Sequence, residues 1–381
     1  MKIVPTQDQL DLQATLRSVL AKHCPTTLVR ELRDPAADAW PKHLVAALAD
    51  VGALGLATDE AHGGSGAGLY ELGLFFAEAG RALCPSSIYS SLLLGVALGR
   101  LGTPAQQERH LPALAAGELR ATTAISNPAD AGDVRPVLTA VPAEGGGWAL
   151  SGTLPFVVNA EGAEVVLVTA RARVYAEPTR TLGFLVDPTA AGWQAQALET
   201  MSGERVSRVV LTDVLVPATA VLAGQDGRGL STDDLRWVAN AAVALQCMEM
   251  VGGTAAVLDQ TVAHISTREQ FGRPIGSFQA AQHLVADIHI ALDAARLAAH
   301  SAVWWLGRGE CATRPVAIAT MRCNEAYKWA TLNAHQLHGG MGYVRETDLH
   351  LWSERAKTTE VWGGTADVAA RWLQEELGLV H

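Results

Sequence analysis

The hydrophobic periodicity of this 381-residue chain changes twice, and this constrains its fold more than any other feature. Apolar residues recur every three or four positions up to about Leu114 and again from about Ser231, as in amphipathic helices. Between them, short β-branched runs are separated by Gly and Pro clusters, as in a sheet. The sequence therefore predicts an α+β protein with three domains, namely an amino-terminal helical domain (1–119), a β-domain (120–225) and a carboxy-terminal helical bundle (226–381).

The β-branched runs lie at residues 134–141, 165–169 and 206–211. The segments between them are too short for crossover helices, which parallel strands usually need. We therefore expect an antiparallel sandwich or barrel. In the last third, residues 239–256 are apolar on almost every side, which predicts a helix buried among several neighbours. A further helix is expected to begin near Phe278.

Charge and cysteine content narrow the class of partner. The chain has 29 Lys and Arg against 39 Asp and Glu, a formal charge of −10, which disfavours nucleic acid and anionic membranes but permits anionic small ligands in a local basic pocket. The five cysteines form no CxxC pair or His/Cys cluster, so no metal site is expected. The amino terminus is rich in acids and glutamines, and no uninterrupted apolar run reaches membrane-spanning length. We expect a cytoplasmic protein.

Two segments have the residue types that a dinucleotide needs. The first runs from Arg268 through Phe271 to Gln279 as REQFGRPIGSFQ, and the second runs from Gln336 to Tyr343 as QLHGGMGY. A pyrophosphate requires positive charge and close approach of the backbone, which an arginine and paired glycines supply.

At this order and spacing, the two segments resemble the R-x-x-F-G-x-x-I-x-x-F-Q and Q-x-x-G-G-x-G-Y signatures of the acyl-CoA dehydrogenase family. The resemblance covers nearly the whole chain. It implies an FAD-dependent α,β-desaturation of an acyl-CoA thioester, with an electron-transferring flavoprotein as acceptor. It also implies at least a dimer, because in the family the arginine segment reaches the flavin held by the neighbouring chain. By this resemblance the cofactor-binding residues are Ser126, Phe156, Arg268, Phe271, Gln279, Gln336, Leu337, His338, Gly339, Gly340, Thr365 and Asp367.

The β-domain departs from the family pattern at polar positions. Where the family has T/S-E-P-x-x-G-S-D, this chain has SNPADAGD from Ser126 to Asp133, with Asn127 and Gly132 as departures. Where the family has W-I-T-N, this chain has FVVN from Phe156, so a valine replaces the threonine that would contact the flavin edge. A core aromatic on a strand explains Phe156 almost equally well.

The catalytic carboxylate is missing from both of its usual positions. Desaturation needs an Asp or Glu to remove the α-proton while the β-hydrogen leaves as hydride. The resemblance places this base at Gly363 or, in some members, at Ala242. The acids nearest in sequence are Asp233, Asp234, Glu249 and Glu360, and for each of them a structural role is the stronger interpretation.

Three functions remain open from the sequence. The chain is a working flavoenzyme with a relocated base, or the non-basic subunit of a heteromeric dehydrogenase whose partner carries the carboxylate, or a flavin- or CoA-binding member of the fold without redox activity. Steroid side-chain dehydrogenases of actinobacteria resemble the heteromeric arrangement.

Overall fold

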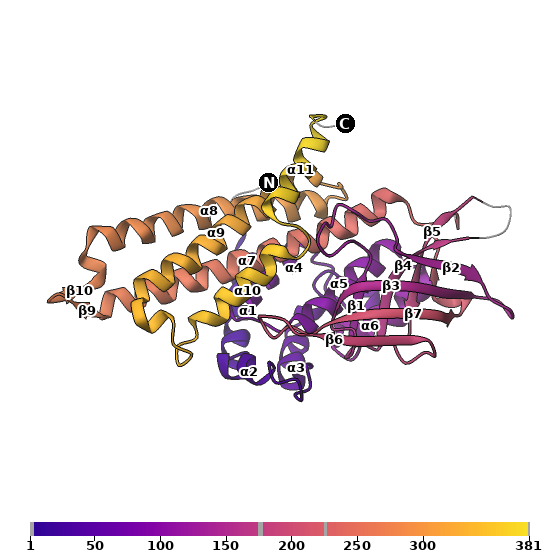
Figure 1. Ribbon diagram of the computed structural model, residues 1–381, viewed down its shortest axis with the longest axis horizontal. Coiled ribbons are helices and arrows are strands. Elements are labelled where there is room, and N and C mark those ends of the chain that lie inside the picture. The colour runs from indigo at the N-terminus through magenta and orange to yellow at the C-terminus, as the bar shows by residue number, and fades with distance from the viewer. Residues whose placement is uncertain (1–3, 174–177, 225–226, 380–381) are drawn as a thin grey trace. The chain divides into compact units, whose positions relative to one another are not determined.

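The computed structural model describes residues 4–173, 178–224 and 227–379, and it contains helical, β and helical regions in that order (Figure 1). The first region holds α1 (Gln7–His23), α2 (Thr26–Glu31), α3 (Lys42–Asp50), α4 (Leu69–Arg81), α5 (Ser86–Leu101) and α6 (Pro104–Ala115). The last holds α7 (Thr232–Thr267), α8 (Gln279–Gly307), α9 (Thr313–His338), α10 (Leu349–Val361) and α11 (Ala366–Glu376), with the short hairpin of β9 (Glu269–Gln270) and β10 (Arg273–Pro274) between α7 and α8.

The fold class predicted from the sequence is thereby confirmed. The change from helix to strand falls between Ala115 and Ala121, next to the expected boundary at residue 119. The second expected boundary, between residues 225 and 226, lies outside the described residues. The backbone forms two compact units that divide the chain differently: unit 1 comprises Met1–Val29, Leu69–Cys84 and Asn240–His381, and unit 2 comprises Arg30–Gly68 and Pro85–Ala239.

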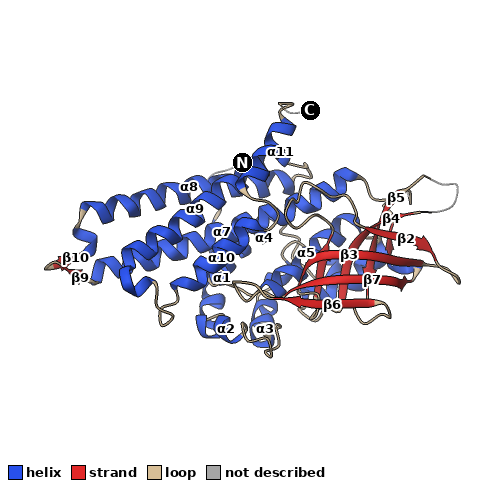
Figure 2. Cartoon of the chain, in the orientation of Figure 1, coloured by secondary structure: helices blue, strands red, loops and turns tan. Residues whose placement is uncertain are grey.

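Unit 2 contains a single eight-stranded sheet (Figure 2). Its strands are β1 (Ala121–Ala124), β2 (Leu138–Pro142), β3 (Trp148–Val158), β4 (Val165–Ala172), β5 (Arg180–Val186), β6 (Trp193–Leu198), β7 (Val206–Val216) and β8 (Val221–Leu222). Their order is β6-β7-β3-β2-β4-β5-β8, with β1 beside β4. Fully buried residues such as Leu138, Val166 and Phe184 form its core.

The prediction of a purely antiparallel sheet is wrong in one respect, because β4 pairs in parallel with both β1 and β2. β2 and β3 form an antiparallel pair. The chain then returns to the other side of β2 and enters β4, so β3 and its return loop make the crossover. No helix is needed, and the argument from short spacing overlooked this route.

The long helix α7 forms the centre of unit 1. Its backbone approaches α4 so closely that a Cβ atom on Gly252 would lie 1.7 Å from the carbonyl oxygen of Ala77. This explains the Ala- and Gly-rich composition, since larger side chains would separate the two helices. By length and composition alone α7 qualifies as able to cross a membrane, but 83% of its most apolar window is buried inside the structure. The predicted helix buried among several neighbours is therefore confirmed.

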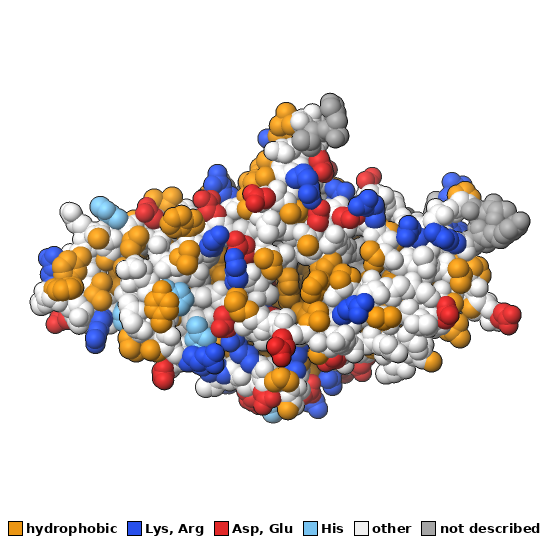
Figure 3. Space-filling model, viewed as in Figure 1, with side chains coloured by type: hydrophobic (Ala, Val, Ile, Leu, Met, Phe, Trp, Pro, Cys, Tyr) orange, Lys and Arg blue, Asp and Glu red, His pale blue; other side chains and the backbone are white. Residues whose placement is uncertain are grey.

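Charged side chains of both signs are interspersed over the face drawn in Figure 3. This agrees with a net charge that is not concentrated in one tract.

Candidate functional site

A pocket of about 730 Å³ in unit 1 brings together seven of the predicted cofactor-binding residues. Its wall contains Arg268, Phe271, Gln336, Leu337, His338, Gly339 and Gly340, together with eight further residues that include His264, Phe278 and Met341. We call it the α7–α9 pocket, because the ends of these two helices form much of its wall. Segments separated by more than sixty positions in the sequence thus converge as predicted.

Arg268 lies directly after α7, and its backbone holds the β9–β10 hairpin in place. Its N–H donates to the carbonyl oxygen of His264 at 2.8 Å, and its own carbonyl accepts from the N–H of Ile275 at 2.9 Å. This pair of bonds brings the chain back beside the end of α7. The guanidinium is exposed and remains available to an anion.

Phe271 occupies an unusual backbone position at the tip of this hairpin. Its φ is 54° and that of Gly272 is 80°, the combination found in type I′ turns, where Asn and Gly are favoured. A bulky residue with positive φ is strained, by about 1 kcal/mol or more. The Phe271 ring is 94% exposed and meets Phe278 edge-on at a centroid distance of 6.2 Å.

The glycine pair offers open backbone to a ligand. α9 ends at His338, and Gly339 has φ 57°. A Cβ on Gly339 or Gly340 would meet no atom within 4 Å, so these peptides face open space rather than packed protein. Close approach of a phosphate to backbone N–H groups needs such a surface.

The other predicted cofactor-binding residues lie elsewhere. Gln279 is the exposed first residue of α8, beside the pocket residues Phe278 and Ala280. Ser126 and Phe156 belong to unit 2, and the Phe156 ring is 53% exposed. That exposure argues against the alternative of a core aromatic.

Thr365 and Asp367 stand at the start of α11. The Thr365 hydroxyl accepts from the N–H of Val368, which makes it the N-cap, and Asp367 is exposed in the first turn. Helix capping accounts for the threonine without a ligand, so its cofactor role stays a prediction.

The departures after Ser126 are explained by local hydrogen bonds. The Asn127 side-chain oxygen accepts from the N–H of Ala129 at 3.0 Å, an Asx turn that orders the loop. Asp133 pairs with Arg135 at 2.7 Å, and hydrogen bonding from that guanidinium lowers the pKa of Asp133. The loop is therefore stabilised by its own side chains.

At the usual base position, Gly363 has φ 75°, in the left-handed region that disfavours residues with a Cβ. The segment is fixed by Gln246 on α7, whose side-chain NH₂ donates to the carbonyls of Thr359 at 2.7 Å and Trp362 at 3.1 Å. Ala242, the alternative base position, lies one turn before Gln246 on the same helix. Neither position offers a proton acceptor.

Two of the four candidate acids are held by basic groups near the surface. Asp234 accepts from Arg100 at 2.8 Å and from the Ser231 hydroxyl. Glu360 contacts Lys357 at 2.6 Å and Lys328 at 3.3 Å. Burial raises the pKa of Glu360, but the hydrogen bonds from the two lysines outweigh it and the pKa lies below its usual value. Asp233 is exposed at the start of α7.

Glu249 is buried in unit 1 and paired with Arg355 of α10. The two side chains lie 2.8 Å apart, and the guanidinium also donates to the carbonyl of Cys84 at 2.6 Å. Burial raises the pKa of Glu249 to about 8, while the adjacent guanidinium favours the ionised form. This geometry matches the structural alternative, an acid paired with an arginine from a neighbouring helix.

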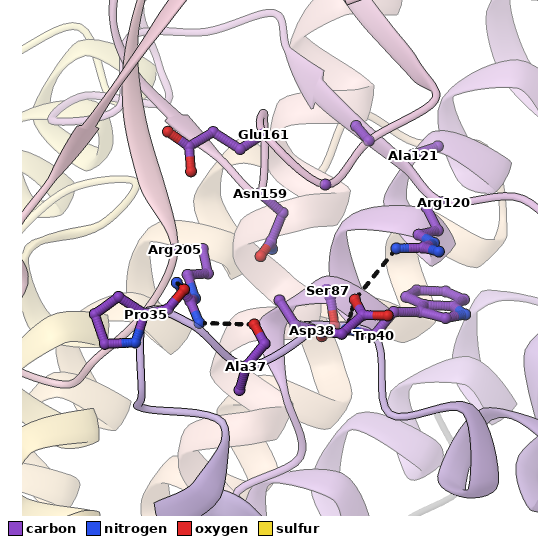
Figure 4. Close-up of a pocket in the computed structure, with 13 residues that line it drawn as sticks. Pro35, Ala37, Asp38, Trp40, Ser87, Arg120, Ala121, Asn159, Glu161 and Arg205 are labelled. Atoms are coloured by element: carbon purple, nitrogen blue, oxygen red, sulfur yellow. Dashed lines mark hydrogen bonds and ion pairs between the residues drawn. The ribbon is translucent and has the colours of Figure 1, made fainter.

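A second pocket, of about 280 Å³, lies in unit 2 beneath residues 35–40 (Figure 4). Arg205 donates to the carbonyls of Pro35 and Ala37 at 2.9 and 3.1 Å, and Arg120 pairs with Asp38 at 3.2 Å. Both guanidiniums are bound to oxygens of the protein itself. We therefore interpret this pocket as a gap where the loop of residues 35–40 packs, and not as an anion-binding site.

Sequence reasoning missed two residues of the site region, His264 and Gln246. His264 lies four positions before Arg268, the spacing that puts two side chains on one helix face, and this signal was available. Gln246 had no such signal, since its partners are carbonyls 113 and 116 positions away.

Comparison with known proteins identifies the family of the chain. Residues 6–118 match the family model described as acyl-CoA dehydrogenase, N-terminal domain, and residues 236–378 match acyl-CoA dehydrogenase, C-terminal domain. A probable acyl-CoA dehydrogenase of Bacillus subtilis, YngJ, is 30% identical over 345 residues, which is 86% of this chain and 88% of that one.

Two solved structures are similar over almost their whole length. A variant of the Tcur3481-Tcur3483 steroid ACAD is 28% identical with a TM-score of 0.85, covering 98% of both chains. The ChsE4-ChsE5 complex from Mycobacterium tuberculosis is 26% identical with a TM-score of 0.87, covering 100% of both chains. This chain belongs to the acyl-CoA dehydrogenase family of oxidoreductases.

Proposed function

We propose that this chain is the FAD-binding, non-basic subunit of a heteromeric acyl-CoA dehydrogenase, and that a related chain supplies the carboxylate. The proposal rests on the contrast between the α7–α9 pocket and the position of the catalytic base. Seven of the twelve residues expected to hold a dinucleotide line one pocket, whereas the base position is a glycine with φ 75°.

The α7–α9 pocket suits the phosphate-bearing half of FAD. Arg268 offers a bidentate donor, and Gly339 and Gly340 expose their backbone. Phe271 offers an exposed ring for stacking, at a backbone cost that is otherwise unexplained. By the family resemblance, this pocket serves the flavin held mainly by a neighbouring subunit. When bound, FAD accepts the hydride that leaves the β-carbon of the thioester.

The proton acceptor is better placed on a partner than relocated within this chain. Asp234 and Glu360 are neutralised by basic side chains, and Glu249 is buried against Arg355. An acid that serves as base must reach the substrate α-proton with a free lone pair. Each of these three carboxylates already lies within ion-pair distance of a basic side chain.

We infer that the substrate is a CoA thioester with a bulky, ring-bearing acyl group. Support comes from the two structural relatives, one named a steroid ACAD and the other a two-component complex. We propose an electron-transferring flavoprotein as acceptor, as the family resemblance implies. The five free cysteines fit a reducing compartment, and we place the protein in the cytoplasm.

The proposal is tested by expressing the chain alone and together with a homologous dehydrogenase chain that carries an acid at either base position. We expect desaturation of a steroid-side-chain CoA thioester only from the pair. Desaturation by the chain alone would favour a relocated base, and a pair that binds no flavin would favour a member of the fold without redox activity.

A further inference from the structure

Two imidazoles stack on each other in the wall of the α7–α9 pocket. His264 comes from the last turn of α7 and His338 from the end of α9, with ring centroids 4.2 Å apart and ring planes inclined by 17°. Both line the pocket beside Arg268. The pair lies in the same wall as the glycine backbone, and His338 directly precedes Gly339.

The orientation of His338 defines where it accepts a proton. Its Nδ1 lies 2.8 Å from the carbonyl oxygen of Ala334, and a carbonyl only accepts, so Nδ1 carries the hydrogen. Nε2 then bears the lone pair. A second proton on this ring can therefore be added only at Nε2.

The groups that face the pair are cationic or neutral. Arg268 follows α7, His335 lies one turn earlier on α9, and the α8 wall contributes Ala280, Ala281 and Leu284. His335 is held by the Ser353 hydroxyl of α10 at 2.6 Å, and burial is the main cause that lowers its pKa. His350 of α10 also acts on His335. None of the described residues that line the pocket is an Asp or Glu.

The surroundings of His264 disfavour its charged form. Burial lowers the pKa of His264, and the neighbouring His338 and Arg268 lower it further. A pyrophosphate reverses the sign of the local field, because two anionic phosphates favour the imidazolium form. Protonation of one imidazole would give the stacked pair a positive charge, and the pair could then donate a charged hydrogen bond to the phosphate.

We propose that the His264–His338 pair takes up a proton when a pyrophosphate group occupies the α7–α9 pocket, so that dinucleotide binding there is coupled to pH. This rests on the proposed function in assigning FAD to the pocket. The coupling makes the affinity rise as pH falls, by up to about tenfold per pH unit for one proton taken up.

The test is isothermal titration calorimetry on the flavin-free full-length chain with inorganic pyrophosphate and, separately, with FAD. Each titration is run at pH 7 in two buffers with different ionisation enthalpies, since the difference in heat counts the protons exchanged by protein and ligand together. Inorganic pyrophosphate itself titrates near neutral pH, so the FAD titration, whose pyrophosphate diester does not, gives the share of the protein directly. We expect uptake of roughly 0.5 to 1 proton per pyrophosphate. The double variant His264→Gln with His338→Gln should take up less than about a third of that. His283→Gln, on the exposed side of α8, is the matched control and should behave as the parent does.

Pyrophosphate that does not bind, that binds with equal heat in both buffers, or whose proton uptake persists in the double variant would overturn the proposal. Should the double variant not fold, imidazole NMR titration of the unchanged chain decides instead. The pKa of at least one imidazole of the pair must rise on adding pyrophosphate, and constant values for both would overturn it. Failure of FAD to bind where pyrophosphate binds with proton uptake would count against the flavin assignment alone.

Discussion

Gly363 lacks a side chain, and its backbone conformation also disfavours one. Its φ of 75° lies where an L-residue costs about 1–2 kcal/mol. An acid introduced there starts with this strain, and Gln246 fixes the preceding carbonyls so that the segment cannot relax freely. Restoring the carboxylate would therefore require a change in the backbone at residue 363 as well as a change of side chain.

We expect Gly363→Glu to leave the chain alone without desaturase activity and to lower its free energy of unfolding by about 1–2 kcal/mol. Gly363→Ala is the matched control, because it adds the Cβ without the carboxylate and should lose similar stability. Urea denaturation and an acyl-CoA oxidation assay measure the two effects. An active and fully stable Gly363→Glu variant would contradict the idea that the backbone at residue 363 excludes a working base.

Glu249 illustrates how a buried acid can resemble a catalytic one. We expect Arg355→Met to destabilise the protein by about 3–5 kcal/mol, because it leaves a buried carboxylate without its partner. Glu249→Leu combined with Arg355→Met should cost much less, since an apolar pair often replaces a buried ion pair with little loss.

The conservative change Glu249→Gln separates structure from chemistry. We expect the heteromer containing it to retain turnover and flavin absorbance. Lost turnover with unchanged thermal stability would identify Glu249 as the base instead.

Among the elements, the β9–β10 hairpin is where we expect a residue to lower the stability of the fold while favouring FAD binding. Its turn places Phe271 where Asn is preferred, before Gly272. We expect Phe271→Asn to stabilise the chain by about 1 kcal/mol and to weaken FAD binding at least severalfold, because the exposed ring is lost. Thermal unfolding and a flavin titration check this. If stability and affinity fall together, Phe271 supports the fold rather than a ligand.

Some of the helices and strands could be predicted from the sequence, and the pairing of one strand could not. The helix that begins at Gln279 and the buried helix around residues 239–256 were predictable, because periodicity is a local property. The parallel pairing of β4 with β1 and β2 was not, since it depends on which side of β2 the chain returns to. We find no local sequence pattern between β3 and β4, around Ala160 and Gly162, that indicates the side of β2 on which the chain returns.

The same limit applies to the candidate site. Arg268 and the Gly339–Gly340 pair were predictable from spacing, and the structure brings them together in one pocket. The stacking of His264 on His338 and the hydrogen bonds of Gln246 arise from helix packing, which no local pattern contains. The structural role of Glu249 was foreseen as an ion pair, but its partner Arg355 was not named.

At the scale of the whole molecule, this chain is a family member that we propose binds a dinucleotide in the α7–α9 pocket and has no base of its own. We propose that such a chain gains its activity through assembly, with the dinucleotide pocket and the base on different subunits. A partner is then required by chemistry as well as by interface energy.

The most direct test is the visible spectrum and activity of the purified chain, alone and reconstituted with a related chain bearing the carboxylate. The account predicts that the reconstituted pair is yellow and bleaches on anaerobic addition of a steroid-side-chain CoA thioester, while the chain alone never bleaches. Bleaching of the chain by itself would contradict the account, because it would require a proton acceptor within this sequence.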